Sequence, residues 1–257
     1  MLAPVPIAFT RAVSPLMANC ELTHVPRVPI DIHLAVSQHA VYERVLEGLG
    51  FTVHRLEAAP DLPDSVFVED AAVVLDEVAI VTRPGAASRR PETAAVATAL
   101  ARLRPLEHIV EPGTLDGGDV LQMGRRLFVG RSHRTNDEGI GQLRAIAERV
   151  GWMVHPVPIE RYLHLKSAVT AVAADTLLID PRAVPVDIFE GYRLIETDPR
   201  EVSAANALLA HDTVIYPDAF PGTAERLRAA GIRLQLLDVS EVAKAEGGVT
   251  CCCILIA

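Results

Sequence analysis

One local pattern recurs four times along the 257-residue chain: an apolar, β-rich run, a short polar tip and a second apolar run. This pattern is typical of a β-hairpin. The tips lie at residues 76–77, 124–125, 174–175 and 211–212, so that successive tips are 48, 50 and 37 residues apart. A unit that returns at this interval predicts a radial or stacked arrangement of similar units.

Helical patterns and further strands lie between these hairpins. Residues 91–103, 136–151 and 223–231 have apolar residues at three-to-four spacing and are expected to be helices. Apolar runs at 152–159 and 232–240 follow two of these helices and are expected to be strands. The repeating unit is therefore ββαβ.

The two chain ends supply half a hairpin each. Residues 250–257 form a single apolar run, and residues 6–11 can be its missing strand. Pairing these runs would close a ring of five units. No linker or low-complexity tract divides the chain, so we expect one domain over residues 1–257. The alternative is an ordinary three-layer α/β sheet.

Composition restricts the class of partner. The formal charge of −9 argues against nucleic acid or an anionic membrane as a partner, whereas it favours a cationic small molecule. No run approaches 18 apolar residues, and the first residues do not resemble a secretory signal. The four cysteines lack the spacing of a disulfide framework, which favours a reduced, cytoplasmic protein. The sequence leaves a homodimer open.

Several charged residues lie within otherwise apolar sequence. Buried carboxylates are costly unless a cation pairs with them, so the acids suggest a site for a cationic group; solvated strand ends are the alternative. Arginines that follow two of the hairpins can pair with a carboxylate, or can simply be surface charges. Together the two sets suit a zwitterionic, amino-acid-like ligand with an additional positive end. The acids are Asp64, Glu69, Asp70, Asp116 and Asp119, and the arginines are Arg89, Arg90 and Arg134.

Three consecutive cysteines near the end of the chain are not expected to be equivalent. If they lie on a strand, Cys251 and Cys253 face one side and Cys252 the other, which excludes a shared zinc ion. Cys252 and Cys253 are then expected to be core residues. Cys251 follows two glycines at the entrance to the strand and is a candidate nucleophile. His164, at the start of the third hairpin, is either a buried structural histidine or its acid/base partner.

Seven segments of the sequence resemble the dimethylarginine dimethylaminohydrolase family of the guanidino-group-modifying superfamily. They occur in the family order: PDSVFVED, IVTRPGAASRRPET, TLDGGDVL, VGRSHRTN, LHLKS, AAN and GGVTC. The resemblance implies a five-bladed α/β-propeller of ββαβ units around a central active-site cavity. It also implies hydrolysis of Nω-methylated L-arginines, asymmetric dimethylarginine and monomethylarginine, to L-citrulline and dimethylamine or methylamine, through a covalent thiouronium intermediate and with no metal or organic cofactor.

The resemblance also implies roles for individual residues. The nucleophile would be Cys251, the general acid/base His164, and the acid beside the reacting group Asp116. The remaining residues would bind the substrate: Glu69 and Asp70 its guanidinium, Asp64 its α-amino group, Arg89 and Arg134 its α-carboxylate, and Leu22 and Ala245 through backbone contacts.

One position differs from other members of this family, and another differs from related families. Members often carry Asp before the glycine pair, where this chain has Glu246. Arginine and agmatine deiminases and amidinotransferases usually carry an acid two residues after the histidine, where this chain has Lys166. This difference favours the dimethylarginine branch. The alternatives are a deiminase acting on arginine or another guanidino compound, and a non-catalytic arginine-binding module, which would have no use for Cys251 and His164 together.

Overall fold

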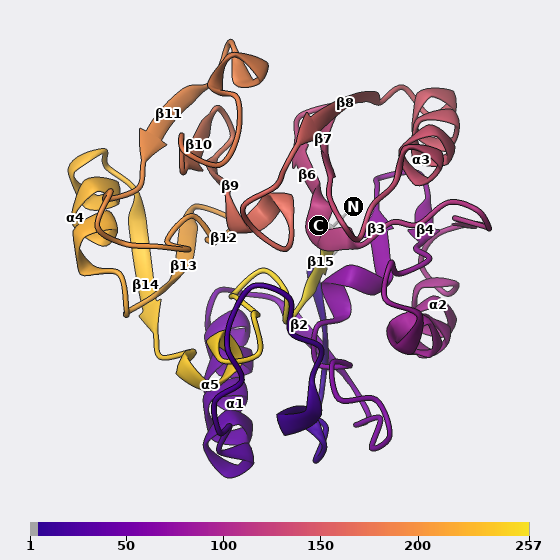
Figure 1. Ribbon diagram of the computed structural model, residues 1–257, viewed down its shortest axis with the longest axis horizontal. Coiled ribbons are helices and arrows are strands. Elements are labelled where there is room, and N and C mark those ends of the chain that lie inside the picture. The colour runs from indigo at the N-terminus through magenta and orange to yellow at the C-terminus, as the bar shows by residue number, and fades with distance from the viewer. Residues whose placement is uncertain (1–4, 257) are drawn as a thin grey trace.

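The structure, a computed structural model that describes residues 5–256, contains five small β-sheets arranged around a common centre (Figure 1). The strands are β1 (Ile7–Arg11), β2 (Thr52–Leu56), β3 (Ala72–Val74), β4 (Ala79–Val81), β5 (Leu106–His108), β6 (Val120–Met123), β7 (Arg126–Arg131), β8 (Met153–Pro158), β9 (Val169–Ala173), β10 (Thr176–Ile179), β11 (Arg193–Glu196), β12 (Leu208–Ala210), β13 (Thr213–Pro217), β14 (Arg233–Leu237) and β15 (Ile254–Ile256).

Helices connect these strands. The described α-helices are α1 (Ile32–Gly48), α2 (Thr93–Leu100), α3 (Asp137–Arg149), α4 (Pro221–Ala229) and α5 (Ser240–Ala243). The described 3₁₀ helices are η1 (Met17–Asn19), η2 (Val68–Ala71), η3 (Ala87–Glu92), η4 (Gly117–Asp119), η5 (Leu165–Ser167) and η6 (Val186–Phe189). Helices α1 to α4 lie on the outside of the ring (Figure 1).

Every sheet has the same connectivity. Its first and second strands are antiparallel, and its third strand is parallel to the second. In four sheets the antiparallel pair is a hairpin; in the fifth it joins β15 to β1. The sheets are β15-β1-β2, β3-β4-β5, β6-β7-β8, β9-β10-β11 and β12-β13-β14. First strands of neighbouring sheets contact one another, as β6 and β12 both do with β9. The predicted ring is therefore confirmed, and a single three-layer sheet is wrong.

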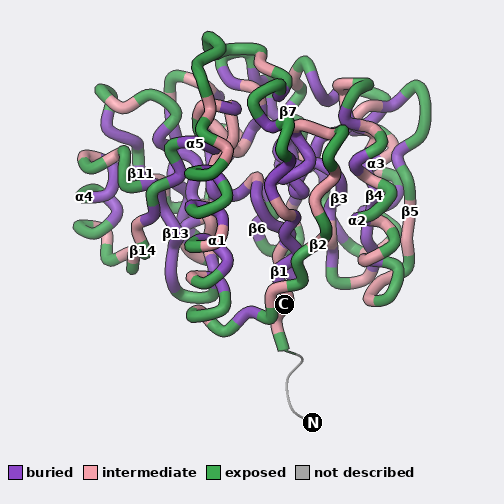
Figure 2. Tube along the Cα trace, turned by 90° about the horizontal axis from the view of Figure 1, so that it is seen from below, coloured by how far each residue is buried: buried purple, intermediate pink, exposed green. Residues whose placement is uncertain are grey.

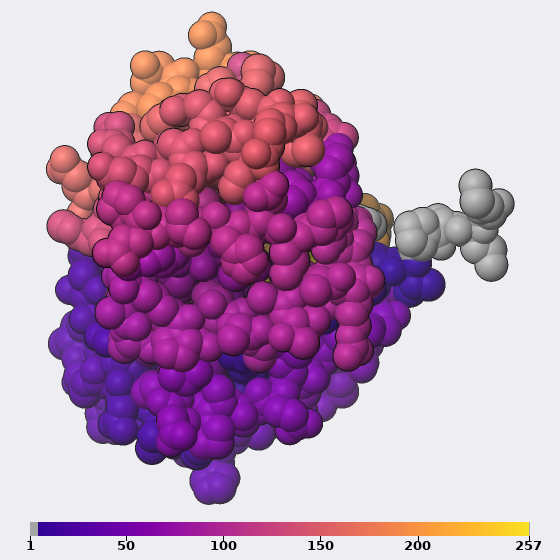
Figure 3. Space-filling view, turned by 90° about the vertical axis from the view of Figure 1, so that its right-hand side faces the viewer, coloured from indigo at the N-terminus to yellow at the C-terminus, as the bar shows by residue number. Residues whose placement is uncertain are grey.

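The ring closes where the two ends of the chain meet. Strand β1 pairs antiparallel with β15, with Ile7 opposite Ile256 and Phe9 opposite Ile254. This is the pairing that the sequence predicts. Figure 3 shows one side of the ring, where the indigo, magenta and orange segments of successive units follow one another.

One unit departs from the predicted ββαβ pattern. Between β10 and β11 the chain forms only the short helix η6 instead of an α-helix. Pro181 and Pro185 explain the difference, because proline lacks the amide hydrogen that a helix interior needs. The predicted helices at 91–103, 136–151 and 223–231 are confirmed as α2, α3 and α4.

The core lies between each sheet and its outer helix. In the third unit, Ile140 and Leu143 of α3 pack with Leu127 and Val129 of β7, all of them almost completely buried. Each such side chain stabilises the fold by about 1.5–3 kcal/mol. Buried residues concentrate in the strands and exposed ones on the outer helices and loops (Figure 2). Within residues 5–256, none of the helices has the length and apolar character needed to cross a membrane.

Candidate active site

A short turn precedes the first strand of each sheet and carries a polar residue towards the centre of the ring. Asp70 lies in η2 before β3, and Asp116 and His164 are the N-cap residues of η4 and η5. Asn206 precedes β12, and Cys251 lies in the turn before β15. The five sheets therefore contribute one residue each to a common region, although these residues are far apart in the sequence.

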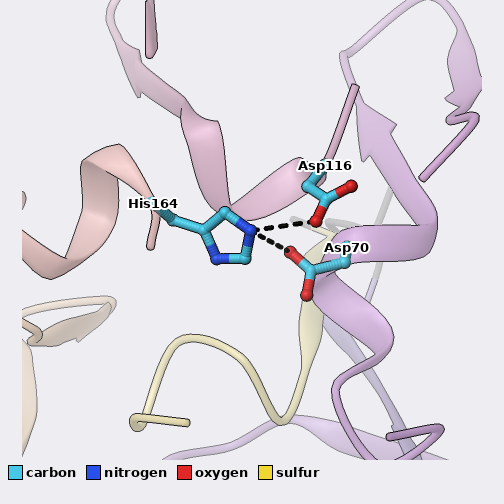
Figure 4. Close-up of side chains that lie close together, drawn as sticks. All are labelled: Asp70, Asp116 and His164. Carbon is cyan, nitrogen blue, oxygen red and sulfur yellow. Dashed lines mark hydrogen bonds and ion pairs between the residues drawn. The ribbon is translucent and has the colours of Figure 1, made fainter. Parts of the chain in front are cut away.

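One ring nitrogen of His164 faces two carboxylates (Figure 4). Its Nε2 is 3.0 Å from Asp116 Oδ2 and 3.9 Å from Asp70 Oδ1, and all three side chains are buried. Burial by itself lowers the pKa of His164, but the charge of Asp70, the hydrogen bond to Asp116 and the charge of Asp119 outweigh it and raise the pKa to about 9. The imidazole is therefore protonated at neutral pH and can act as a general acid.

A buried arginine fixes the orientation of Asp70. Arg89 donates from Nη1 to Asp70 Oδ2 at 2.6 Å, and the backbone amide of Gly118 donates to Asp70 Oδ1 at 2.9 Å. Burial favours the neutral acid, but the nearby charges of His164 and Arg89 hold the pKa of Asp70 well below its usual range. The other donors of Arg89 reach Glu92 and the carbonyl groups of Asp64 and Phe67. Arg89 thus has most of its donors occupied, and its role at a substrate carboxylate stays a prediction.

Arg134 differs from Arg89 because it retains an unused donor. Its Nη1 is buried without a hydrogen-bond partner among the described residues and lies 3.8 Å from Asp116 Oδ2. Its Nη2 donates weakly to Thr23 Oγ1 at 3.4 Å. Asp116 itself accepts from the backbone amide of Gly85 at 2.9 Å. A buried, unpaired guanidinium nitrogen is a ready partner for an incoming carboxylate.

Cys251 and His164 line the same pocket. Its sulfur accepts the backbone amide of Gly248 at 3.3 Å, and its carbonyl accepts the amide of Glu69 at 3.2 Å. Burial and the neighbouring Glu69 and Asp70 carboxylates raise the pKa of the Cys251 thiol to about 12. The resting residue is therefore a neutral thiol. A cation beside these carboxylates would favour the thiolate.

The reason for treating the three cysteines differently needs correction. They lie in a turn, and strand β15 begins only at Ile254, so strand alternation does not separate their side chains. The distinction survives on burial: Cys252 and Cys253 belong to the hydrophobic core, whereas Cys251 is only partly buried and faces the pocket.

An ion pair that sequence reasoning did not assign lies behind the residues that line the pocket. Lys166 Nζ lies 2.7 Å from Glu69 Oε1 and 3.2 Å from the Gly117 carbonyl. The other oxygen of Glu69 accepts from Thr250 at 2.8 Å, and Asn206 donates to Thr250 Oγ1 at 3.0 Å. Lys166, Asn206 and Thr250 occur in the segments LHLKS, AAN and GGVTC, so the resemblance of these segments could have identified them. On the far side of the pair is a separate cavity of about 330 Å³.

Residues 20–28, here called the flap, cover the pocket. The amide of Glu21 donates to both oxygens of Asp64, and the amides of Thr23 and His24 donate to Glu246 at 2.6 and 2.5 Å. The remaining pocket has a volume of only about 10 Å³. This is about the space of one water molecule, so a larger ligand requires the flap to move.

Most of the residues predicted for the site come together. The pocket is lined by Asp64, Asp70, Arg89, Arg134, His164, Ala245 and Cys251. Asp116 and Glu69 lie behind them and contact His164 and Lys166. Leu22 is not in the lining; it packs against the hydrophobic cluster of the first unit. Its predicted backbone contact with a ligand remains a prediction.

Asp70, Asp116 and His164 also offer the atom types of a metal site. Their nearest ligand atoms lie within 4.8 Å of one another. Both carboxylates already face arginines, and a histidine must be neutral to bind a metal, whereas the pKa of His164 is raised to about 9. The arrangement therefore suits proton transfer better than metal binding.

Known proteins resemble this chain over most of its length. No family model matches. The N(G),N(G)-dimethylarginine dimethylaminohydrolase of Streptomyces coelicolor is 43% identical over 255 residues, covering 95% of this chain and 94% of the relative. The enzyme of the same name from Pseudomonas aeruginosa is 37% identical and covers 86% and 88%. A solved structure of the Pseudomonas aeruginosa protein, a cysteine-to-serine variant complexed with citrulline, superposes with a TM-score of 0.92 at 33% identity and covers 97% and 98%.

Proposed function

The chain belongs to the dimethylarginine dimethylaminohydrolase family, and from this premise we propose that it hydrolyses asymmetric dimethylarginine and monomethylarginine to L-citrulline and dimethylamine or methylamine. The observation that carries the proposal is the meeting of Cys251 and His164 in one closed pocket lined by carboxylates and arginines. The citrulline bound to the Pseudomonas aeruginosa relative supports the same product.

The charges of the pocket match a zwitterionic substrate with a cationic end. Arg134 is the group for the α-carboxylate, because its Nη1 has no hydrogen-bond partner among the described residues, with Arg89 beside it. Asp64 is the group for the α-amino group, since its oxygens now accept the amide of Glu21, which a ligand can displace. The guanidinium then lies between Cys251 and the Asp70 carboxylate, where opposite charge favours it.

Substrate binding activates the nucleophile. Burial and the neighbouring carboxylates keep the Cys251 thiol protonated; a guanidinium beside these carboxylates offsets their charge, which lowers the pKa of the thiol. The thiol releases its proton to solvent, where the amine product takes it up as an ammonium ion, and the thiolate attacks the guanidinium carbon. His164 then gives its proton to the departing amine nitrogen as the C–N bond breaks, and a thiouronium cation remains on the sulfur.

Water completes the reaction. Neutral His164 takes one proton from water while the oxygen adds to the thiouronium carbon. Collapse of this adduct breaks the C–S bond, the second proton goes to sulfur, and citrulline leaves with Cys251 and His164 restored to their resting states. Asp116, 3.0 Å from His164 Nε2, stabilises the imidazolium whenever His164 carries the proton.

The proposal extends to the assembly and location of the site. The five units act as one domain, because no single unit holds both Cys251 and His164. All four cysteines are free, in keeping with a reduced, cytoplasmic protein.

Turnover of four guanidino compounds tests the proposal. Purified protein is incubated with asymmetric dimethylarginine, monomethylarginine, arginine and agmatine, and the ureido product is quantified. We expect the methylated arginines to have the highest kcat/KM. Fastest turnover of arginine would instead identify a deiminase. Binding without turnover of any compound would identify a binding module.

Variants of the cysteines test the nucleophile. Cys251→Ser should abolish turnover and the covalent adduct seen by intact-protein mass spectrometry. Cys252→Ser, one residue along the chain, is the matched control and should keep both. Full activity in Cys251→Ser would exclude it as the nucleophile.

A further inference from the structure

Asp119 is a buried carboxylate behind His164 and Asp116, and it does not line the pocket. Asp119 ends η4 and is completely buried. It accepts three hydrogen bonds: the Leu165 amide at 2.9 Å on Oδ1, and the hydroxyls of Ser132 at 2.6 Å and Thr135 at 2.7 Å on Oδ2. A carboxylate held by three short bonds fixes its donors in place.

Each of these donors is adjacent to a residue of the site. Leu165 directly follows His164 in the chain. The Thr135 hydroxyl also accepts the backbone amide of Asp116 at 3.2 Å, and the Ser132 hydroxyl accepts the amide of Arg134 at 3.0 Å. The Asp119 carboxylate thus connects the backbone segments that carry His164, Asp116 and Arg134.

We infer that Asp119 is a positioning residue for this reaction, which sets His164, Asp116 and Arg134 relative to one another. The inference rests on the proposed function. It assigns the two hydroxyls different tasks: Thr135 transmits the position of Asp119 to Asp116, and Ser132 transmits it to Arg134.

The hydrogen-bond directions require a carboxylate at this position. Each hydroxyl donates to Asp119 and accepts a backbone amide, so it acts as a relay with a fixed direction. In Asp119→Asn the new NH₂ group faces these hydroxyls and must donate to them, which reverses the relay. A longer acid has no room, because even a Cβ placed on Gly130 would collide with Asp119 Oδ1.

The charge of Asp119 also acts on His164. Three acids act on His164: Asp70 from η2, Asp116 at the N-cap of η4, and Asp119 at its end. The Cys251 thiol lines the same pocket. Arg89 forms an ion pair with Asp70, and Arg134 with Asp116. Removing one negative charge from this set lowers the pKa of His164. Because His164 must be protonated to release the amine, the fall of kcat at high pH then begins at lower pH.

The test compares three variants with wild type on asymmetric dimethylarginine. Asp119→Asn should reduce kcat by about 10-fold or more and move the basic limb of the kcat profile down by about one pH unit. Thr135→Val should reduce mainly kcat, because it disconnects Asp116. Ser132→Ala should raise mainly KM, because it disconnects Arg134. Asp198→Asn, which changes a buried acid whose carboxylate accepts hydrogen bonds from Arg200, is the matched control and should leave all three readouts unchanged.

A purely structural role predicts a different result. In that case the variants lower the unfolding midpoint while kcat, KM and the pH profile of the folded fraction stay as in wild type, and the inference is wrong. If Asp119→Asn does not fold, the other two variants decide. A reduced kcat in Thr135→Val together with a raised KM in Ser132→Ala supports the inference, and wild-type values in both contradict it.

Failure of the proposed function is detected separately. Absence of wild-type turnover would contradict the proposed function but not the inference. NMR titration of His164 in wild type and Asp119→Asn then measures the pKa difference without substrate. An unchanged His164 pKa would overturn the inference on its own.

Discussion

The carboxylate of Glu246 is predicted to hold the flap closed. Both of its oxygens accept backbone amides of the flap, from Thr23 at 2.6 Å and from His24 at 2.5 Å. Glu246 itself has a φ of 56°, an uncommon conformation for a residue with a side chain. With the flap in this position the pocket holds about 10 Å³, so opening of these bonds would give a ligand more room.

The strength of this contact follows from its two charge-assisted bonds. Such bonds contribute about 1.5–3 kcal/mol each when buried. These two are solvent-exposed, so about 1 kcal/mol each is a suitable value. Glu246→Ala should therefore shift the flap equilibrium towards the open form by about 2 kcal/mol, or about 30-fold. Glu246→Asp, shorter by one methylene, should lose part of the same energy.

Hydrogen exchange measures this equilibrium directly. The Thr23 and His24 amides should lose about 30-fold of their protection in Glu246→Ala, while amides in β7 keep theirs. KM should rise and kcat should change less, because the flap contact retains the substrate without touching the reacting atoms. Glu57→Gln, at an exposed position away from the flap, is the control. Unchanged protection of Thr23 and His24 in Glu246→Ala would refute the reasoning.

Two further predictions concern pH and the core. The pKa of His164 is raised from 6.5 to about 9, so its contribution to stability is complete below pH 6.5 and is lost as the pH rises through 9. Between pH 6 and pH 10, the free energy of unfolding measured in urea should therefore fall by about 3 kcal/mol more for wild type than for His164→Gln. Equal losses in the two proteins would contradict a protonated His164. Cys252→Ser and Cys253→Ser should each lower the free energy of unfolding by about 1–2 kcal/mol, since both thiols are buried, with kcat close to wild type; a large loss of kcat with unchanged stability would contradict a packing role.

The hairpins could be predicted because their signal is local. Two apolar runs around a polar tip predict the pair β6 and β7, and the tip residue Gly124 takes the left-handed conformation that such a turn needs. Helix α1 was not predicted, because polar residues occupy its buried face. Gln38, His39 and Glu43 are all buried there, with Gln38 bonded to Ser240, so the apolar periodicity is interrupted.

The chemistry of the site could be predicted better than its geometry. The resemblance provided Cys251 and His164, but residue types do not reveal which donors are already occupied. Arg89 and Arg134 appear equivalent in the sequence, yet one is bonded to Asp70 and the other has a free nitrogen. The closed flap was also beyond reach, because the contact of Glu246 with Thr23 joins residues 223 positions apart.

Closure of the ring is what assembles the catalytic residues. Asp116 and His164 enter from neighbouring sheets of the chain interior, whereas Cys251 belongs to the sheet made from both chain ends. Its turn leads into β15, which is held by only three residue pairs with β1. The amide of Glu69 on the Cys251 carbonyl and the Thr250 hydroxyl on the Glu69 carboxylate add contacts from the next unit. These two hydrogen bonds help to position the nucleophile, and they also join the sheet made from both chain ends to the second unit.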